Sequence, residues 1–222
     1  MIVLTDRVFS PQKTAPLLML IAVVFFLLPR QAQAESTLLD KVIGLNLGLN
    51  GYSIGKKLTP EQKKIAAAHR EDDAHAGTIK FVDNDLHVIV DKESGRVLAL
   101  YKRKEGVGKP ELKNMIAELM DHFDAPTVMA HDKIIYWAYT RHGALSEEDF
   151  AKAKKVGQVP QLGIIATVKL NSDIEIAPDP QKTTSKDQES DAGNSDDQQG
   201  VIYFIITSDP LVKQFLDKRQ EQ

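Results

Sequence analysis

Side chains that commonly bind metal ions are concentrated in one short stretch of the chain, which contains His69, Asp72, Asp73 and His75. Imidazole nitrogens and carboxylate oxygens are ligands for zinc and other divalent metals, but a site must hold them on a defined frame. This stretch follows the expected end of a helix and lies in a run of charged residues. We therefore predict a solvated connection here, with a metal site formed by this cluster as the alternative.

A second candidate for chemistry is the pair His131 and Asp132, which lies in an expected turn. A carboxylate that orients an imidazole can make it a general base, as many hydrolases require. No serine or cysteine nucleophile stands out near the pair, and the chain has no G-x-G-x-x-G, H-E-x-x-H, G-x-S-x-G or Walker-type motif. The sequence predicts a protein that is not an enzyme and has no cofactor, with a periplasmic hydrolase that uses His131 and Asp132 as the alternative.

Aromatic residues gather in segment 134–139, which contains Tyr136, Trp137 and Tyr139. Tyrosine and tryptophan are enriched at protein–protein interfaces, although they also fill cores and sheet surfaces. Successive side chains of a strand point to opposite faces, so Tyr136 and Trp137 should lie on different sides. We take these three residues as the candidate interaction surface, with burial in the core as the alternative.

The first 34 residues have the pattern of a signal peptide. Arg7 and Lys13 precede the apolar run 17–28, which is too short to span a bilayer comfortably, and Ala32 and Ala34 fit a signal-peptidase site. We predict cleavage after Ala34, a location in the bacterial periplasm and no membrane span in the remaining chain. An uncleaved N-terminal anchor is the alternative. In the periplasm, the expected partner is another envelope protein.

Charge and composition narrow the partners and the fold. The formal net charge is −3, and the first 34 residues carry three basic residues and one acidic residue, which leaves −5 for the rest. Nucleic-acid binding normally requires a basic surplus, so nucleic acid is not an expected partner. The chain has no cysteine, and therefore no disulfide. Residues 177–200 hold six acidic residues and no large apolar side chain, which predicts a disordered loop between neighbouring strands.

The first half of the remaining chain predicts one helix followed by three strands. Residues 43–52 alternate apolar residues with glycine and asparagine, which favours an extended or looping segment. Thr59, Pro60 and Gln62 have the pattern of a capping box, which starts a helix that should end near residue 68. Apolar residues then recur at every second position, which predicts strands at 78–82, 86–90 and 96–101.

The second half repeats this order with insertions. From Pro110, a single apolar stripe at helical spacing is formed by Leu112, Met115, Ile116, Leu119, Met120 and Phe123. Strands are predicted at 134–139, 162–170 and 201–207, with a short helix after Ser146 and a last helical turn from Asp209. We predict an α+β fold with helices packed on an antiparallel sheet, built from two related α-β-β-β units at residues 35–108 and 109–222.

Three stretches carry a resemblance to a known fold. They are residues 119–123 with the turn Asp124-Ala125-Pro126, the pattern Trp137-Ala138-Tyr139, and residues 86–91 with Gly95-Arg96-Val97. These stretches resemble the fold shared by the β-lactamase-inhibitor-protein group and the BamE-type outer-membrane assembly lipoproteins, although Asp124 stands where that fold usually has glycine. The resemblance implies a non-catalytic binding or assembly module of the cell envelope.

Overall fold

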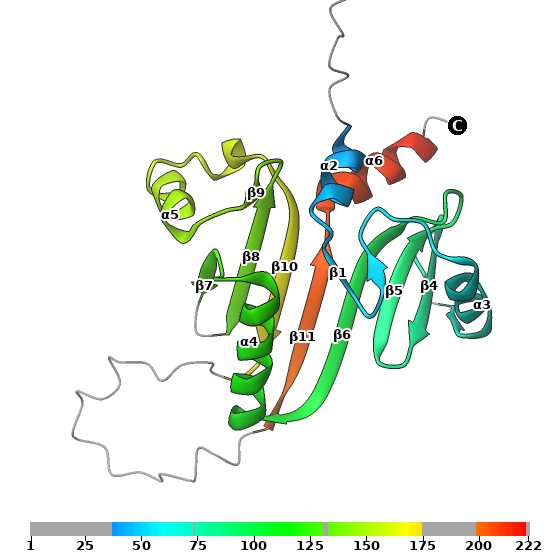
Figure 1. Ribbon diagram of the computed structural model, residues 1–222, viewed down its shortest axis with the longest axis horizontal. Helices are drawn as coiled ribbons and strands as arrows, with labels where there is room; N and C mark the ends of the chain where they lie inside the picture. The colour runs from blue at the N-terminus through cyan, green and yellow to red at the C-terminus, as the bar shows by residue number, and fades with distance from the viewer. Residues whose placement is uncertain (1–36, 73, 131–132, 175–198, 221–222) are drawn as a thin grey trace, which may run out of the picture. The chain divides into compact units, whose positions relative to one another are not determined.

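Figure 1 shows the computed structural model of the chain, which describes residues 37–72, 74–130, 133–174 and 199–220. The described residues form a nine-stranded sheet in which all neighbouring strands are antiparallel, together with a two-stranded hairpin and several helices. The predicted α+β class, with helices packed on an antiparallel sheet, is confirmed.

The helices are α2 (Leu38–Gly44), α3 (Pro60–Ala68), α4 (Lys109–Phe123), α5 (Glu147–Lys155), the 3-10 helix η1 (Val159–Leu162) and α6 (Asp209–Gln220). The hairpin consists of β1 (Gly48–Leu49) and β2 (Tyr52–Ser53). The sheet consists of β3 (Arg70–Glu71), β4 (Thr78–Asp83), β5 (Leu86–Asp91), β6 (Val97–Gly108), β7 (Val128–Ala130), β8 (Ile134–Thr140), β9 (Gly143–Ala144), β10 (Ile164–Ser172) and β11 (Gln199–Thr207).

The strand order reads β3-β4-β5-β6-β11-β10-β8-β7, with β9 paired to β8 outside this path. The last strand of the first half, β6, therefore lies beside the last strand of the second half, β11, at the centre of the sheet. From this junction, each half runs outward to its own earliest strand, β3 or β7. In each half a helix, α3 or α4, comes directly before the strands of the main path, and four such strands follow it where three were predicted. The second half also contains β9, α5 and η1 between these strands.

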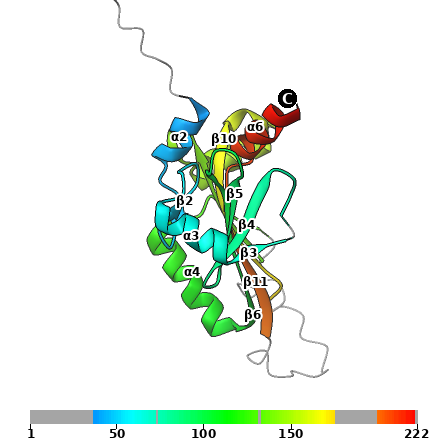
Figure 2. The ribbon, with the colours of Figure 1, turned by 90° about the vertical axis from the view of Figure 1, so that its right-hand side faces the viewer.

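Helices α2, α3 and α4 lie on one side of this sheet (Figure 2). In the side view of Figure 2, α2, α3 and α4 are on the same side of the strands, which we call the helix-covered face. Directly paired residues of an antiparallel sheet point to the same side. One such row crosses six strands under the helices and is fully buried: Phe81, Val88, Leu100, Ile206, Val168 and Trp137.

Local sequence explains the helices that were predicted. In α3, the Thr59 hydroxyl accepts a hydrogen bond from the Gln62 amide at 3.2 Å, and the Gln62 side chain accepts one from the Thr59 amide at 2.9 Å. This is the predicted capping box, and α3 ends at Ala68 as expected. The apolar stripe of α4 is also confirmed, because its members are either buried or packed against the core.

The segment before α3 differs from its prediction. Residues 43–52 were expected to be extended or looping, but the end of an unpredicted helix, α2, includes Ile43 and Gly44; its Thr37 and Asp40 form a capping box. Only the following β1–β2 hairpin is extended, and its turn uses Asn50 and Gly51 at φ values of 50° and 81°. Asn-Gly is the pair that such tight hairpin turns favour, since both residues tolerate positive φ.

The boundaries in the second half also need correction. Strand β10 begins at Ile164, because the preceding residues form η1 and end at Gly163 in the left-handed conformation. Strand β11 begins at Gln199, so residues 199 and 200 are not part of a loop; β6 extends to Gly108 and supplies their pairing partners. The rest of the predicted disordered loop lies outside the described residues. Helix α6 spans 12 residues, where only a turn was expected.

Candidate functional site

The sheet surface opposite the helices α2, α3 and α4, which we call the open face, carries an in-register row of aromatic, basic and aliphatic side chains. This central row crosses strands β5, β6, β11, β10 and β8 through direct pairs, in the order His87, Tyr101, Ile205, Lys169 and Tyr136. All five residues are half-buried. Neighbouring strands lie about 4.8 Å apart, so the row spans roughly 19 Å of continuous surface.

A second row, next to the first on the open face, contains the most exposed apolar side chains of the sheet face. It runs through Arg103, Tyr203, Asn171 and Ile134, which also pair directly across the strands. Tyr203 is 38% exposed and Ile134 is 36% exposed. In the described part of the chain, two other large apolar residues are also exposed: Met129 at 49% and Val156 at 63%. Two of the four therefore lie in one row.

At the β3 edge of the open face, one carboxylate holds two basic groups. The Glu71 carboxylate accepts a hydrogen bond from the Lys80 ammonium at 3.0 Å and lies 3.1 Å from the His87 ring nitrogen Nδ1. The His87 ring stacks on Tyr101 with centroids 4.3 Å apart, and the Lys80 ammonium lies 5.6 Å from the same tyrosine ring. Burial raises the pKa of Glu71, but hydrogen bonds and charges from Lys80 and His87 outweigh burial and leave this pKa below its ordinary value.

Near the centre of the open face, Arg103 is fixed by two contacts. Its Nε atom donates a hydrogen bond to the Tyr203 hydroxyl at 3.0 Å, and its guanidinium lies 5.8 Å from the centre of the Tyr203 ring. The guanidinium also forms an ion pair with Glu105, two positions further along β6. Arginine and tyrosine held rigidly in this way lose little side-chain entropy when a partner binds.

Lys169 has a different environment from the other two cations. Its ammonium lies 5.6 Å from the centre of the Tyr136 ring. Within the described part of the chain, neither an ion pair nor a hydrogen bond joins the Lys169 side chain to another residue. Burial, and to a lesser extent the charge of Asp209, raises the pKa of Tyr136, so this tyrosine stays protonated and can donate a hydrogen bond.

The structure separates the three predicted interaction residues. Tyr136 lies on the open face, but Trp137 is 2% exposed and Tyr139 is also buried, both on the helix-covered side. The Trp137 indole donates a hydrogen bond to the Asp124 carbonyl oxygen at 2.9 Å, which ties β8 to the end of α4. Burial, followed by the nearby charge of Asp124, raises the pKa of Tyr139 to about 12. Whether any of the three contacts a partner stays a prediction.

Only part of the predicted metal-binding cluster, and neither member of the predicted His131–Asp132 pair, lies within the described residues. His69, Asp72 and His75 are all exposed, and the amide of His69 bonds back to Ile65 at the end of α3. Among the described residues, no three histidine or acidic side chains are grouped as metal ligands. Asp73, His131 and Asp132 lie outside the described residues. The described residues also include no helix long and apolar enough to cross a membrane.

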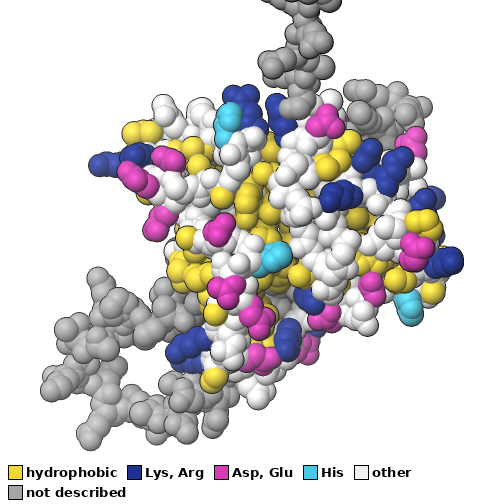
Figure 3. Space-filling model, in the orientation of Figure 1, with side chains coloured by type: hydrophobic (Ala, Val, Ile, Leu, Met, Phe, Trp, Pro, Cys, Tyr) yellow, Lys and Arg dark blue, Asp and Glu magenta, His cyan; other side chains and the backbone are white. Residues whose placement is uncertain are grey.

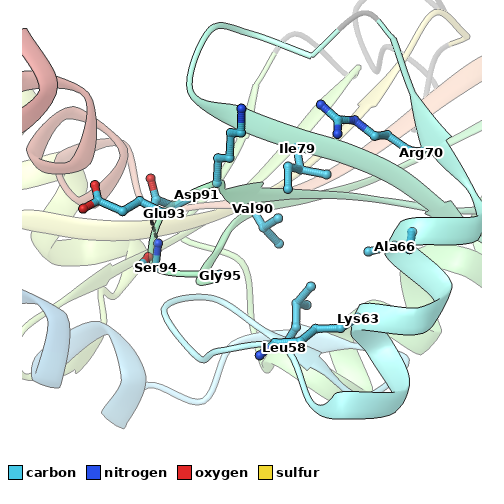
Figure 4. Close-up of a pocket in the computed structure, with 12 residues that line it drawn as sticks. Leu58, Lys63, Ala66, Arg70, Ile79, Val90, Asp91, Glu93, Ser94 and Gly95 are labelled. Carbon is cyan, nitrogen blue, oxygen red and sulfur yellow. Dashed lines mark hydrogen bonds between the residues drawn. The ribbon is translucent and has the colours of Figure 1, made fainter.

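Three of the hollows that described residues line are found around the sheet. The first, of about 390 Å³, lies between α3 and the strands β4 and β5; Figure 4 shows Leu58, Ile79 and Val90 directed toward it, with the basic residues Lys63 and Arg70 around it. Its apolar lining can accept an apolar group, and its charged surroundings can orient a polar one. This hollow was not predicted, because its lining comes from separate elements of the first half: α3 with its flanking residues, β4, and β5 with the turn that follows it.

The other two hollows lie on opposite faces of the sheet. A groove of about 400 Å³ on the helix-covered face is bounded by Met115 and Leu119 of α4 and has Phe204 in its lining. Figure 3 views this side of the molecule and shows hydrophobic side chains between the charged groups over the middle of the sheet. A hollow of about 480 Å³ lies between α6 and the open face, where Val212 lies opposite Ile89.

Comparisons of the chain with protein-family models, with curated proteins and with solved structures find no match. The open face must therefore be interpreted from its own residues. Sequence reasoning identified Tyr136 but not the rows that cross the strands. The available signal was the alternation of Lys169 and Tyr203 with apolar residues, although the sequence alone does not show which strands are neighbours.

Proposed function

We propose that the protein is an exported, non-catalytic interaction or assembly module of the bacterial cell envelope. Its signal peptide is removed after Ala34, and the mature chain works in the periplasm. Its partner is another envelope protein, which docks on the open face of the sheet.

The observation that carries this proposal is the composition of the two adjacent rows. Tyr203 and Ile134 expose large apolar surfaces side by side with Tyr101, Tyr136 and the cations between them. Exposure to solvent alone does not account for aromatic and aliphatic side chains placed in register on a surface. Tyrosine and arginine dominate the binding energy of protein interfaces because they bury much area and make directed polar contacts.

The arrangement of the face favours a protein over a small molecule. The rows are carried by five paired strands and span roughly 19 Å, which matches an extended contact rather than a closed cavity. Regular strands hold the side chains firmly, so docking requires little rearrangement. The resemblance of residues 119–126, 137–139 and 86–97 to envelope proteins that work by binding supports the same conclusion.

Crosslinking in the cells that produce the protein tests the proposal. The full-length chain should give a discrete crosslinked species with one envelope protein. In the double variant Tyr203→Ser and Ile134→Ser, this species should fall at least tenfold while the melting temperature stays within a few degrees. Val156→Ser is the matched control, because Val156 is 63% exposed but follows α5, outside the sheet.

The control variant should retain the crosslinked species in full. If the double variant retains it as well, the partner binds elsewhere and the open face is not the docking surface. If the exported protein captures no partner reproducibly and turns over a small molecule, the non-catalytic proposal is wrong.

A further inference from the structure

The three cations of the open face differ in what neutralises them. Lys80 is paired with Glu71 at 3.0 Å, and Arg103 is paired with Glu105. Lys169 has only the ring of Tyr136 beside it, and no residue that the structure describes forms an ion pair with it. Among the described residues, no carboxylate is therefore in direct contact with Lys169, although the charge of Asp209 acts on the neighbouring Tyr136.

Lys169 also lies where a partner docked on the central row would cover its ammonium group. It lies in the central row between Ile205 of β11 and Tyr136 of β8, and all three side chains are half-buried. A partner that contacts both apolar neighbours must also cover the ammonium group between them. Removing an ammonium from water is strongly unfavourable unless an opposite charge or several hydrogen-bond acceptors replace the lost water.

The surroundings of Lys169 fit a carboxylate. Tyr136 offers a phenolic hydroxyl in the same row, and Asn171, two residues further along β10, presents a side-chain amide on the same face. Both groups can donate hydrogen bonds to carboxylate oxygen lone pairs that do not accept from the ammonium. Two aliphatic side chains, Ile205 beside Lys169 in the central row and Ile134 opposite Asn171 in the second row, favour apolar residues next to the acidic one.

We propose that the open face recognises a polypeptide segment in which an aspartate or glutamate is flanked by apolar residues, and that the carboxylate pairs with Lys169. The inference rests on the proposed function and adds the chemistry of the partner to it. The distance from Tyr101 to Tyr136 covers three strand spacings, or about 14 Å. An extended segment of about four residues spans that distance, which leaves room for one acidic residue between two apolar ones.

Two fluorescently labelled peptides test this proposal on the purified protein by anisotropy. The first has the sequence Gly-Leu-Tyr-Asp-Leu-Tyr-Gly, and the second has asparagine in place of aspartate. The aspartate peptide should bind at least fivefold more tightly than the asparagine peptide. Lys169→Gln should remove this preference, and about 0.5 M salt should weaken it in the parent protein. Lys113→Gln is the matched control, because it changes the net charge equally at an exposed position of α4 on the other side of the sheet.

The outcomes separate this inference from the proposal beneath it. If both peptides bind equally and Tyr203→Ser weakens both, the open face binds protein segments but does not select an acid, and only the present inference is overturned. The same holds if Lys113→Gln reduces the preference as much as Lys169→Gln, since the effect would then be one of net charge. If neither peptide binds, recognition of an acidic segment at Lys169 is also overturned.

Discussion

The two faces of the same strands differ in what their side chains contact. On the helix-covered face, Leu100 and Val168 are fully buried in the core beneath the helices. One residue away on the same strands, Tyr101 and Lys169 point to the open face and remain half-buried. Alternation along a strand explains why the faces differ, but it does not require the open face to contain tyrosines and isoleucines.

The two faces of the sheet contribute differently to folding. The covered rows supply apolar burial, which is the main favourable contribution to folding. The open rows hold apolar and charged groups in register without burying them completely. They therefore contribute less to the free energy of folding. The proposal that the open rows contact another molecule accounts for this arrangement. Paired substitutions on the two faces test how differently the faces contribute to stability.

The largest expected difference comes from truncating one apolar residue on each face of the central strands. Leu100→Ala removes a fully buried side chain of β6 and should lower the free energy of unfolding by about 3 kcal/mol, because it leaves a cavity. Ile205→Ala removes a half-buried side chain of β11 and should cost about 1 kcal/mol. Urea unfolding measures both; equal losses would show that the open face is part of the core.

A smaller difference is expected between neighbouring residues of β8. Trp137→Phe removes the indole hydrogen bond to the Asp124 carbonyl and leaves a gap beside Phe123, so it should cost about 2 kcal/mol. Tyr136→Phe removes only a hydroxyl group from the open face and should cost less than about 0.5 kcal/mol. Circular dichroism during urea unfolding measures both variants. A larger loss for Tyr136→Phe would contradict the assignment of the faces.

The smallest effect concerns Glu71, whose pKa is lowered in the folded protein by Lys80 and His87 despite partial burial. A carboxyl with a lowered folded pKa stabilises the protein fully above its ordinary pKa of 4.5, and this contribution is lost as the pH falls through the lower folded value. Replacing Glu71 by Gln removes the contribution. The melting temperatures of parent and variant should therefore differ at neutral pH and converge in acid. A difference that grows as the pH falls would contradict this ion cluster.

Much of the fold could be predicted because its signals are local. The capping box at Thr59, the stripe of α4 and the period-two strands each depend on residues close in sequence. Helix α2 was missed because it has only seven residues and uses Asp40 in its capping box, where glutamate or glutamine is the usual signal. Strand β6 was predicted too short because residues 102–105 are all charged and lack an apolar alternation.

The candidate site could be predicted only in part because it depends on long-range pairing. The sequence placed Tyr136 and Trp137 on opposite faces, and the structure agrees. It did not indicate that β6 and β11 are neighbours, since about a hundred residues separate Arg103 from its contact Tyr203. Without that register, the basic and aromatic positions of five strands could not be recognised as two continuous rows.

Site-specific photocrosslinking shows which face of the sheet a partner contacts. A photoreactive benzoylphenylalanine replaces either Tyr203 on the open face or Asn114, an exposed residue of α4 on the helix-covered side. Irradiation of intact cells should give a discrete adduct with an envelope protein from position 203 and none from position 114. An adduct from position 114 with none from position 203 would contradict the account, because the partner would then contact the side covered by the helices.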